Sequence, residues 1–190
     1  MARAFVAVVP PGEVLDAVEA AMVRARPHVP GARWSTREKW HVTLQFLGDY
    51  ADLDAAAAAL EQVGLVAGGL GSEGVRFGGV RFGGAGAFAR SERATVLWLG
   101  FAAGAGLLEA LAATVGEAFS PLGLSPDGRP FVPHLTLARM RAPRDVRRAI
   151  SAVGRGPVGP EWIPDAVALM ESTLRREGPR YRVHAEIPLG

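Results

Sequence analysis

The chain has 190 residues, no cysteine and a formal net charge of +2 at pH 7. Its length fits one ordinary domain, or two small halves that share a core. The lack of cysteine excludes disulfide scaffolds, thiolate metal sites and cysteine nucleophiles. The small net charge argues against non-specific electrostatic binding to nucleic acid. Histidine is then the only side chain whose ordinary pKa lies near neutrality, and the chain has four: His28, His41, His134 and His184.

The apolar segments of the chain are short. No run reaches the length of a membrane span, and the apolar stretch near the N-terminus is too short for a signal peptide. We therefore expect a cytoplasmic protein with no membrane partner. No long apolar or amphipathic surface calls for a protein partner, so a monomer is expected.

Hydrophobic periodicity in the first half predicts alternating strands and helices. Residues 3–9 are mostly apolar and stop at two prolines, as expected of a buried strand. Apolar side chains then recur at helical spacing over residues 12–26. A second strand is expected at 40–47, and an Ala-rich helix at 52–63.

A glycine-rich stretch at 64–93 separates the two halves. It contains VRFGG twice, at 75–79 and at 80–84. The Val and Phe pairs predict one or two strands with glycine bulges. The glycines lack the strand and helix setting of a phosphate-binding loop.

The second half predicts the same kinds of elements again. The expected elements are a strand at 94–101, a helix at 105–119, a strand at 134–140, a helix at 144–153 and strands at 166–174 and 180–187.

A shift of 93 residues aligns the two halves without a gap. It places LDAV (15–18) on LEAL (108–111) and HVTL (41–44) on HLTL (134–137). Ala- and Leu-rich helices align easily by chance, but the shared His-x-Thr does not. The sequence therefore predicts one bilobal domain over 1–190 with pseudo-twofold symmetry. Its expected parts are pseudo-repeats at about 3–64 and 94–155, and C-terminal strands over 166–187 that complete the sheets.

The two His-x-Thr segments place polar side chains on one face of each strand. Threonine occurs only 6 times in the chain, so two His-x-Thr pairs among four histidines are improbable by chance. Side chains on a strand alternate between its faces. His41 therefore shares a face with Thr43, and His134 with Thr136, while the residues between them point to the core. A twofold relation would bring both polar faces to one central cleft.

Two imidazoles and two hydroxyls suit one type of reaction. One imidazole can deprotonate water while the other protonates a leaving oxygen. The hydroxyls can donate to the non-bridging oxygens of a phosphate. Cleavage of a phosphodiester, especially a strained cyclic one, suits this set and requires no metal. The alternatives are two structural histidines, or a metal site, for which Glu38 is the nearest acidic residue and a third ligand is not apparent.

The segments HVTLQFLG (41–48) and PHLTLAR (133–139) resemble the paired motifs of the two-histidine (2H) phosphoesterase superfamily. Within it, the chain is similar to the bacterial and archaeal RNA 2′,3′-cyclic phosphodiesterases, historically called 2′-5′ RNA ligases. The segments RAFVAVVPP (3–11), RPFVPHLTLAR (129–139) and LMESTLRREGPRYRVHAEIPL (169–189) are also similar to that family. The resemblance covers nearly the whole chain.

The resemblance implies a fold and a reaction. The implied fold is α+β, with duplicated β-α-β-α units, two antiparallel sheets around a central cleft, and helices outside. The implied reaction is hydrolysis of a 2′,3′-cyclic phosphate, on RNA or a nucleotide, to a 2′-phosphomonoester without metal or other cofactor. By motif position, His41 is the implied proton donor and His134 the implied proton acceptor. Thr43 and Thr136 are implied to bind the phosphate.

Two other activities remain open on the sequence alone. Ligation of RNA halves through a 2′-5′ linkage would use the same residues in reverse. A non-catalytic module that binds RNA ends would keep the same cleft, although the intact histidines and threonines argue against it.

Arg139 and Phe131 are two further candidate contacts for the substrate. Arg139 lies five residues after His134, so regular alternation points it away from the cleft, and only a bulge or the strand end would return it. Phe131 is close to His134 in the sequence and is a candidate for stacking on a terminal base.

Overall fold

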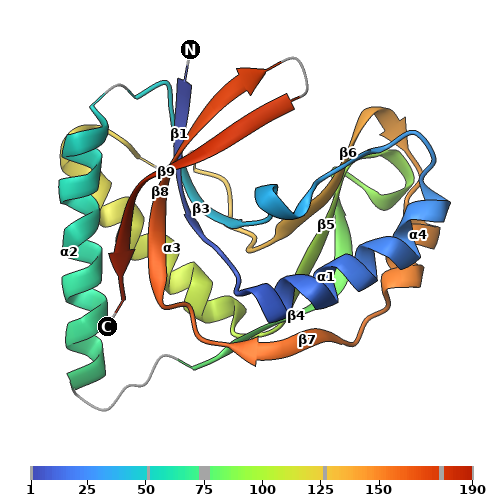
Figure 1. Ribbon diagram of the computed structural model, residues 1–190, viewed down its shortest axis with the longest axis horizontal. Coiled ribbons are helices and arrows are strands. Elements are labelled where there is room, and N and C mark those ends of the chain that lie inside the picture. The colour runs from blue at the N-terminus through green and yellow to red at the C-terminus, as the bar shows by residue number, and fades with distance from the viewer. Residues whose placement is uncertain (1, 51, 73–77, 126–127, 176–177, 190) are drawn as a thin grey trace.

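The structure, a computed structural model, describes the chain except residues 1, 51, 73–77, 126–127, 176–177 and 190. The described residues form an α+β fold of antiparallel strands and four α-helices (Figure 1). The first elements are β1 (Ala2–Val8), α1 (Gly12–Ala25), β2 (Arg33–Trp34), β3 (Val42–Gly48), α2 (Leu53–Ser72) and β4 (Val80–Phe88). The later elements are β5 (Ala94–Ala103), α3 (Ala105–Phe119), β6 (Leu135–Arg144), α4 (Arg147–Val153), β7 (Pro157–Trp162), β8 (Ala166–Arg175) and β9 (Gly178–Pro188).

The order of the strands is symmetric about the centre of the sheet. It runs β7-β4-β5-β6-β3-β1-β8-β9, with β2 paired to β6 beside this path. β6 and β3 meet at the centre through one residue pair, Val42 with Leu135. The two predicted sheets are thus two four-stranded halves that this pair joins. The symmetry of the strand order agrees with the pseudo-twofold that the sequence predicts, while the repeat boundaries remain a prediction.

The helices are exchanged between the two halves of the sheet. α1 follows β1 in the chain but packs on β7 and α4, at the opposite half. α3 follows β5 but packs on α2 and β3 (Figure 1). One continuous apolar core connects both halves, and its members come from all four helices and from strands of both halves. The exchange therefore ties the halves into one folding unit.

A second, smaller apolar cluster lies apart from the main core. It consists of Phe5 and Ala7 of β1 with Ala168 and Met170 of β8, and Tyr181 of β9 packs against it. Their neighbours Val6 and Leu169 belong to the main core. Because side chains alternate along a strand, this cluster covers the face of the sheet opposite to the main core.

The glycine-rich stretch has two different structures. Helix α2 continues to Ser72, well beyond the predicted end at residue 63. It passes close to β9, since a Cβ at Gly64 would lie 2.7 Å from the carbonyl oxygen of Pro188. The predicted end of this helix at residue 63 is therefore too early, because packing on β9 favours a helix that glycine disfavours. The first VRFGG lies partly outside the described residues, and the second begins strand β4 as predicted.

Two short strands are absent from the sequence prediction. β2 has only two residues and β7 contains two prolines and a glycine, so neither shows an alternating pattern. None of the helices in the described part of the chain has the length and apolar character that a membrane span requires.

Candidate active site

His41 and His134 have the same backbone setting. Each lies immediately before a central strand, His41 before β3 and His134 before β6. Each follows a buried residue, Trp40 and Pro133 respectively. The Nδ1 of His41 is 2.8 Å from the carbonyl oxygen of Lys39, and the Nδ1 of His134 is 2.7 Å from that of Val132.

These two hydrogen bonds determine the tautomer of each ring. A carbonyl oxygen can only accept, so each Nδ1 carries the hydrogen and donates it. Nε2 of each ring is then the nitrogen that remains for other chemistry. The short 3₁₀ helix η2 (Arg37–Lys39) places the Lys39 carbonyl for this bond.

The register between β3 and β6 brings the four predicted residues together. Val42 pairs with Leu135 in the antiparallel direction. One step to either side along this register sets His41 across from Thr136, and His134 across from Thr43. Each of these four residues is next to Val42 or Leu135 in its strand. Because side chains alternate between the two faces of a strand, all four side chains point to the face opposite to that of Val42 and Leu135. The charge of His134 contributes to the pKa of His41, as expected of two neighbouring rings.

A bulge in each central strand interrupts this alternation. In β6, Leu97 and Trp98 of β5 pair with Ala138 and Thr136, so Leu137 is an extra residue. In β3, the same irregularity occurs beside Thr43, and Leu44 is the extra residue. The bulge in β6 shifts the alternation of side chains by one residue, so Arg139 lies on the same face of the strand as Thr136.

Arg139 is electrostatically coupled to the site. Its positive charge adds to the effect of burial in lowering the pKa values of His41 and His134, and it opposes the effect of burial, which raises the pKa of Tyr181. The corresponding residue of β3 is Phe46, five residues after His41. Phe46 is 71% exposed, with its ring centroid 6.1 Å from that of Phe5.

Aromatic rings enclose both imidazoles. Phe5 and Tyr181 lie with their centroids 4.8 and 5.2 Å from that of His41. Phe88 and Trp98 lie 4.9 and 6.1 Å from that of His134. These four rings come from β1, β9, β4 and β5, so the sequence gives no local signal that connects them with the histidines.

Burial lowers the pKa of both histidines. For His41, burial lowers the pKa to about 4, and the charges of His134 and Arg139 act in the same direction. For His134, burial lowers the pKa, and Arg139 adds to the effect. The Nδ1 bonds to Lys39 and Val132 act in the opposite direction but are weaker. Both rings are therefore neutral at pH 7 in the ligand-free protein.

A groove of about 450 Å³ lies beside His41. Its lining is mostly apolar and includes Trp40, Met170, Tyr181 and Val183. Such a surface suits a flat organic group better than a hydrated ion.

The remaining sequence candidates lie elsewhere. Phe131 packs against the main core and is not among the rings that contact either imidazole in the described chain. The rings beside His134 are those of Phe88 and Trp98, and stacking of Phe131 on a terminal base stays a prediction. His184 pairs with Asp54 at 3.2 Å, and His28 is exposed. The described residues contain no cluster of three or more His, Asp or Glu side chains that fits a metal ion.

Comparisons with known proteins give one consistent result. The family model of the 2′-5′ RNA ligase superfamily matches residues 10–176. A protein of Aeropyrum pernix named RNA 2′,3′-cyclic phosphodiesterase is 31% identical over 153 residues, 79% of this chain and 82% of its own length. A protein of Aquifex aeolicus with the same name is 30% identical over 164 residues, 83% of this chain and 82% of its own length.

Solved structures have the same fold. The protein TT0787 of Thermus thermophilus superposes with a TM-score of 0.72 and 29% identity, over 98% of this chain and 97% of its own. E. coli LigT complexed with 3′-AMP gives a TM-score of 0.66 and 26% identity, over 98% of this chain and 97% of its own. The match of the family model, the paired His-x-Thr strands and these relatives agree: the chain belongs to the 2′-5′ RNA ligase superfamily of 2H phosphoesterases.

Proposed function

We propose that this protein hydrolyses 2′,3′-cyclic phosphate ends of RNA to 2′-phosphomonoesters. The observation that carries the proposal is the pair of imidazoles on matching strands, each with Nδ1 bonded to a carbonyl and Nε2 left for proton transfer. The names of the Aeropyrum and Aquifex relatives support this substrate. The complex of the E. coli relative with 3′-AMP supports a nucleotide phosphate in this fold.

The proposed reaction is one in-line displacement at phosphorus. Water attacks the phosphorus, and its proton passes to Nε2 of His134. The bond between phosphorus and the ribose 3′ oxygen breaks, and Nε2 of His41 gives its proton to that oxygen. The product has a 2′-phosphate and a free 3′-hydroxyl. The two histidines then exchange protons with water and return to their initial states.

Thr43, Thr136 and Arg139 are proposed to bind the phosphate. The register of β3 and β6 sets each threonine across from the histidine of the other strand, which supports a phosphate bound between the two threonines. Hydroxyl and guanidinium donors stabilise the charge that develops on the non-bridging oxygens. Arg139 lies on the same face because of the bulge in β6.

The pKa values require that substrate and proton bind together. His41 has a pKa of about 4 in the ligand-free protein, so at pH 7 it lacks the proton that a donor must give. An anionic cyclic phosphate between the rings raises both pKa values. The proposal therefore includes the uptake of one proton upon substrate binding. The assignment of donor to His41 comes from its motif position, whereas the pKa of the free protein alone favours His134, which is lowered less.

The test uses an RNA oligonucleotide with a 2′,3′-cyclic phosphate end, in the presence of EDTA. We expect a 2′-phosphomonoester product, identified by phosphorus NMR, and a loss of roughly 10²- to 10⁴-fold upon His41→Ala or His134→Ala. His28→Ala, at an exposed histidine outside the site, is the matched control. No turnover by the wild-type protein, or turnover that survives both site substitutions, would contradict the proposal. A product of joined RNA ends would instead indicate ligation.

A further inference from the structure

Strand β2 places a second arginine beside Arg139. β2 pairs with β6 so that Arg33 is directly opposite Arg139 and Trp34 is opposite Ala138. The backbone N–H of Ser35 donates to the carbonyl oxygen of Leu137 at 2.9 Å, which continues this pairing into the bulge. The two residues of β2, which show no strand pattern in the sequence, are thus paired with β6, the strand that carries Thr136 and Arg139.

Arg33 faces the same side as the two histidines. Residues directly opposite on paired strands point to the same face of the sheet. Trp34 packs against the main core, and its partner Ala138 is fully buried. Arg33 therefore points the other way with Arg139, whose charge acts on both histidines.

The two guanidinium groups are not neutralised. Like charges directly opposite on a sheet destabilise it, and paired residues have Cα atoms only about 4.5–5.5 Å apart. Within the described residues, neither the side chain of Arg33 nor that of Arg139 has an ion pair or a hydrogen-bond partner. An anion between or beside these groups would remove the repulsion.

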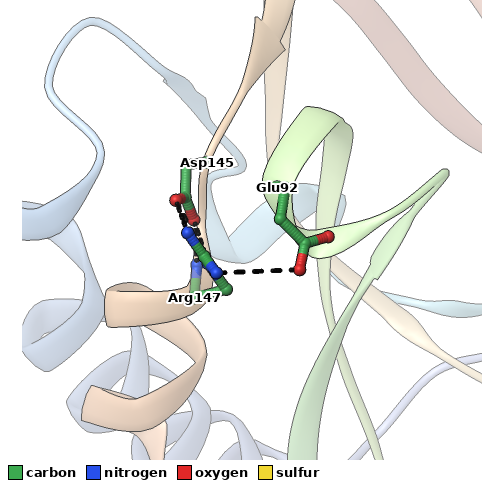
Figure 2. Close-up of polar contacts among 3 residues, drawn as sticks. All are labelled: Glu92, Asp145 and Arg147. Atoms are coloured by element: carbon green, nitrogen blue, oxygen red, sulfur yellow. Dashed lines mark hydrogen bonds and ion pairs between the residues drawn. The ribbon is translucent and has the colours of Figure 1, made fainter.

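Other arginines of the protein show the opposite arrangement. Arg147 donates to Asp145 and lies 3.8 Å from Glu92 (Figure 2), and it holds the pKa of Asp145 at about 2. Arg26 stacks on Trp34 at 5.8 Å, and Arg144 donates to the carbonyl oxygen of Pro30. Arg26, Arg144 and Arg147 are thus engaged within the protein, while the side chains of Arg33 and Arg139 are not.

We propose that Arg33 and Arg139 form a second phosphate subsite, which binds the internucleotide phosphate on the 5′ side of the terminal nucleotide. This inference rests on the proposed function. Arg139 lies on the face of β6 that carries Thr136 and is therefore placed to bind the cyclic phosphate. Arg33, on the neighbouring strand β2, is placed to bind the next phosphate of the same RNA chain. The substrate class is then an oligonucleotide end, and a mononucleotide uses only half of the site.

The experiment compares two substrates that differ by one phosphate. One is a nucleoside 2′,3′-cyclic monophosphate, and the other is a dinucleotide that ends in a 2′,3′-cyclic phosphate. We expect the wild-type protein to have a kcat/KM roughly tenfold or more higher for the dinucleotide, since the second phosphate adds a charge-assisted contact. Arg33→Ala should lose most of this preference, mainly through KM.

Two further variants show what kind of contact is lost. Arg33→Lys keeps the charge but lacks the planar fork of donors, so it should retain part of the preference. Arg155→Ala removes one exposed positive charge next to the edge strand β7 and should leave the preference unchanged. With the dinucleotide, the slope of log KM against log salt should fall by about 1 upon Arg33→Ala.

The opposite outcomes are equally clear. Equal losses on both substrates upon Arg33→Ala, or a loss no larger than with Arg155→Ala, would overturn the subsite. If the wild-type protein hydrolyses neither substrate, the proposed function fails. Calorimetric binding of a dinucleotide 3′-phosphate and a mononucleotide 3′-phosphate then tests the subsite by itself. A dinucleotide advantage that Arg33→Ala removes supports it, and an unchanged advantage or no advantage overturns it.

Discussion

His41 and His134 lie at the ends of strands with the same burial pattern over their first seven residues, and both strands contain a bulge after the threonine. The neighbours of the two strands differ. Thr43 is opposite Ala7, whereas Thr136 is opposite Trp98. The repeated backbone thus sets two imidazoles in equivalent positions, and the neighbours that are not repeated make them chemically different.

This difference matters because an acid and a base must have different proton affinities. Burial lowers the pKa of His41 to about 4 and lowers that of His134 less. Five residues after His41 the chain has Phe46, an exposed apolar ring, whereas five residues after His134 it has the cation Arg139. Two titratable groups whose surroundings separate their pKa values are the usual basis for distinct acid and base roles.

The largest expected effect distinguishes the two histidines. In a substrate whose bridging 3′ oxygen is replaced by sulfur, the leaving group is a thiolate that needs no proton, since thiols have a pKa near 8.5. His41→Ala should then lose less than tenfold in kcat/KM, against roughly 10²- to 10⁴-fold with the oxygen substrate. His134→Ala should lose the full factor with both substrates. Rescue of His134→Ala instead would assign the proton donor to His134.

Folding stability should show the same asymmetry. The pKa of His41 is lower in the folded protein than the 6.5 of the unfolded chain. Between pH 6.5 and about 4 the unfolded chain therefore binds a proton that the folded protein does not, and the free energy of unfolding falls as the pH falls. Over this range His41 should account for a loss of about 3 kcal/mol.

Urea unfolding at pH 7 and at pH 4.5 measures this effect. His41→Phe should reduce the pH dependence strongly, and His134→Phe, in the matched position, should reduce it less. Carboxyl groups titrate in this range in all three proteins, so the comparison uses the differences between them. Equal effects of the two substitutions would show that the surroundings do not separate the histidines.

The chemistry of the site was easier to predict from the sequence than its surroundings. The His-x-Thr strands follow from alternation within five residues, which is local information. The bulges at Leu44 and Leu137 depend on pairing with β1 and β5, so the sequence indicated only that Arg139 needs one. Phe131 is near His134 in the chain, but its ring is partly buried against the main core, a contact that local sequence does not reveal.

The fold shows the same limit. Strands and helices with long periodic patterns were predicted, although α2 extends nine residues past its predicted end, whereas β2 and β7 have patterns too short to recognise. The exchange of α1 and α3 between the halves depends on contacts far apart in the sequence. Arg33 had no signal at all, because its role depends on a pairing of two residues with β6.

Arg139 and Phe46 occupy matching positions in the two halves, and salt should change the effect of replacing them in different ways. Arg139→Ala should reduce kcat/KM roughly 10- to 100-fold at low salt, through lost donors to the phosphate, and the loss should shrink as salt rises. Phe46→Ala should cause a smaller loss that salt does not change, because an apolar contact is not screened. Steady-state kinetics at two salt concentrations checks both. A salt-dependent loss at Phe46 would contradict the distinction.

The smallest expected effect concerns how the second half accommodates Trp98. A Cβ at Gly86 would overlap the indole ring of Trp98, and that ring contacts His134. Gly86→Ala should therefore displace the ring and lower the free energy of unfolding by about 1–3 kcal/mol, as overpacking does. Gly106→Ala is the matched control, because a Cβ there meets open space in helix α3, and it should stabilise by at most about 1 kcal/mol.

The same substitution in a Trp98→Ala protein shows whether the indole ring causes the loss of stability. In a Trp98→Ala protein the ring is absent, so Gly86→Ala should cost little, and the difference between backgrounds measures the coupling of the two residues. An equal cost in both backgrounds would show that Gly86 is needed for the backbone of β4 and not for the ring. The first half has Ala7 opposite its threonine and no ring to accommodate. Gly86 of β4 is then a consequence of placing an aromatic side chain opposite only one of the two threonines.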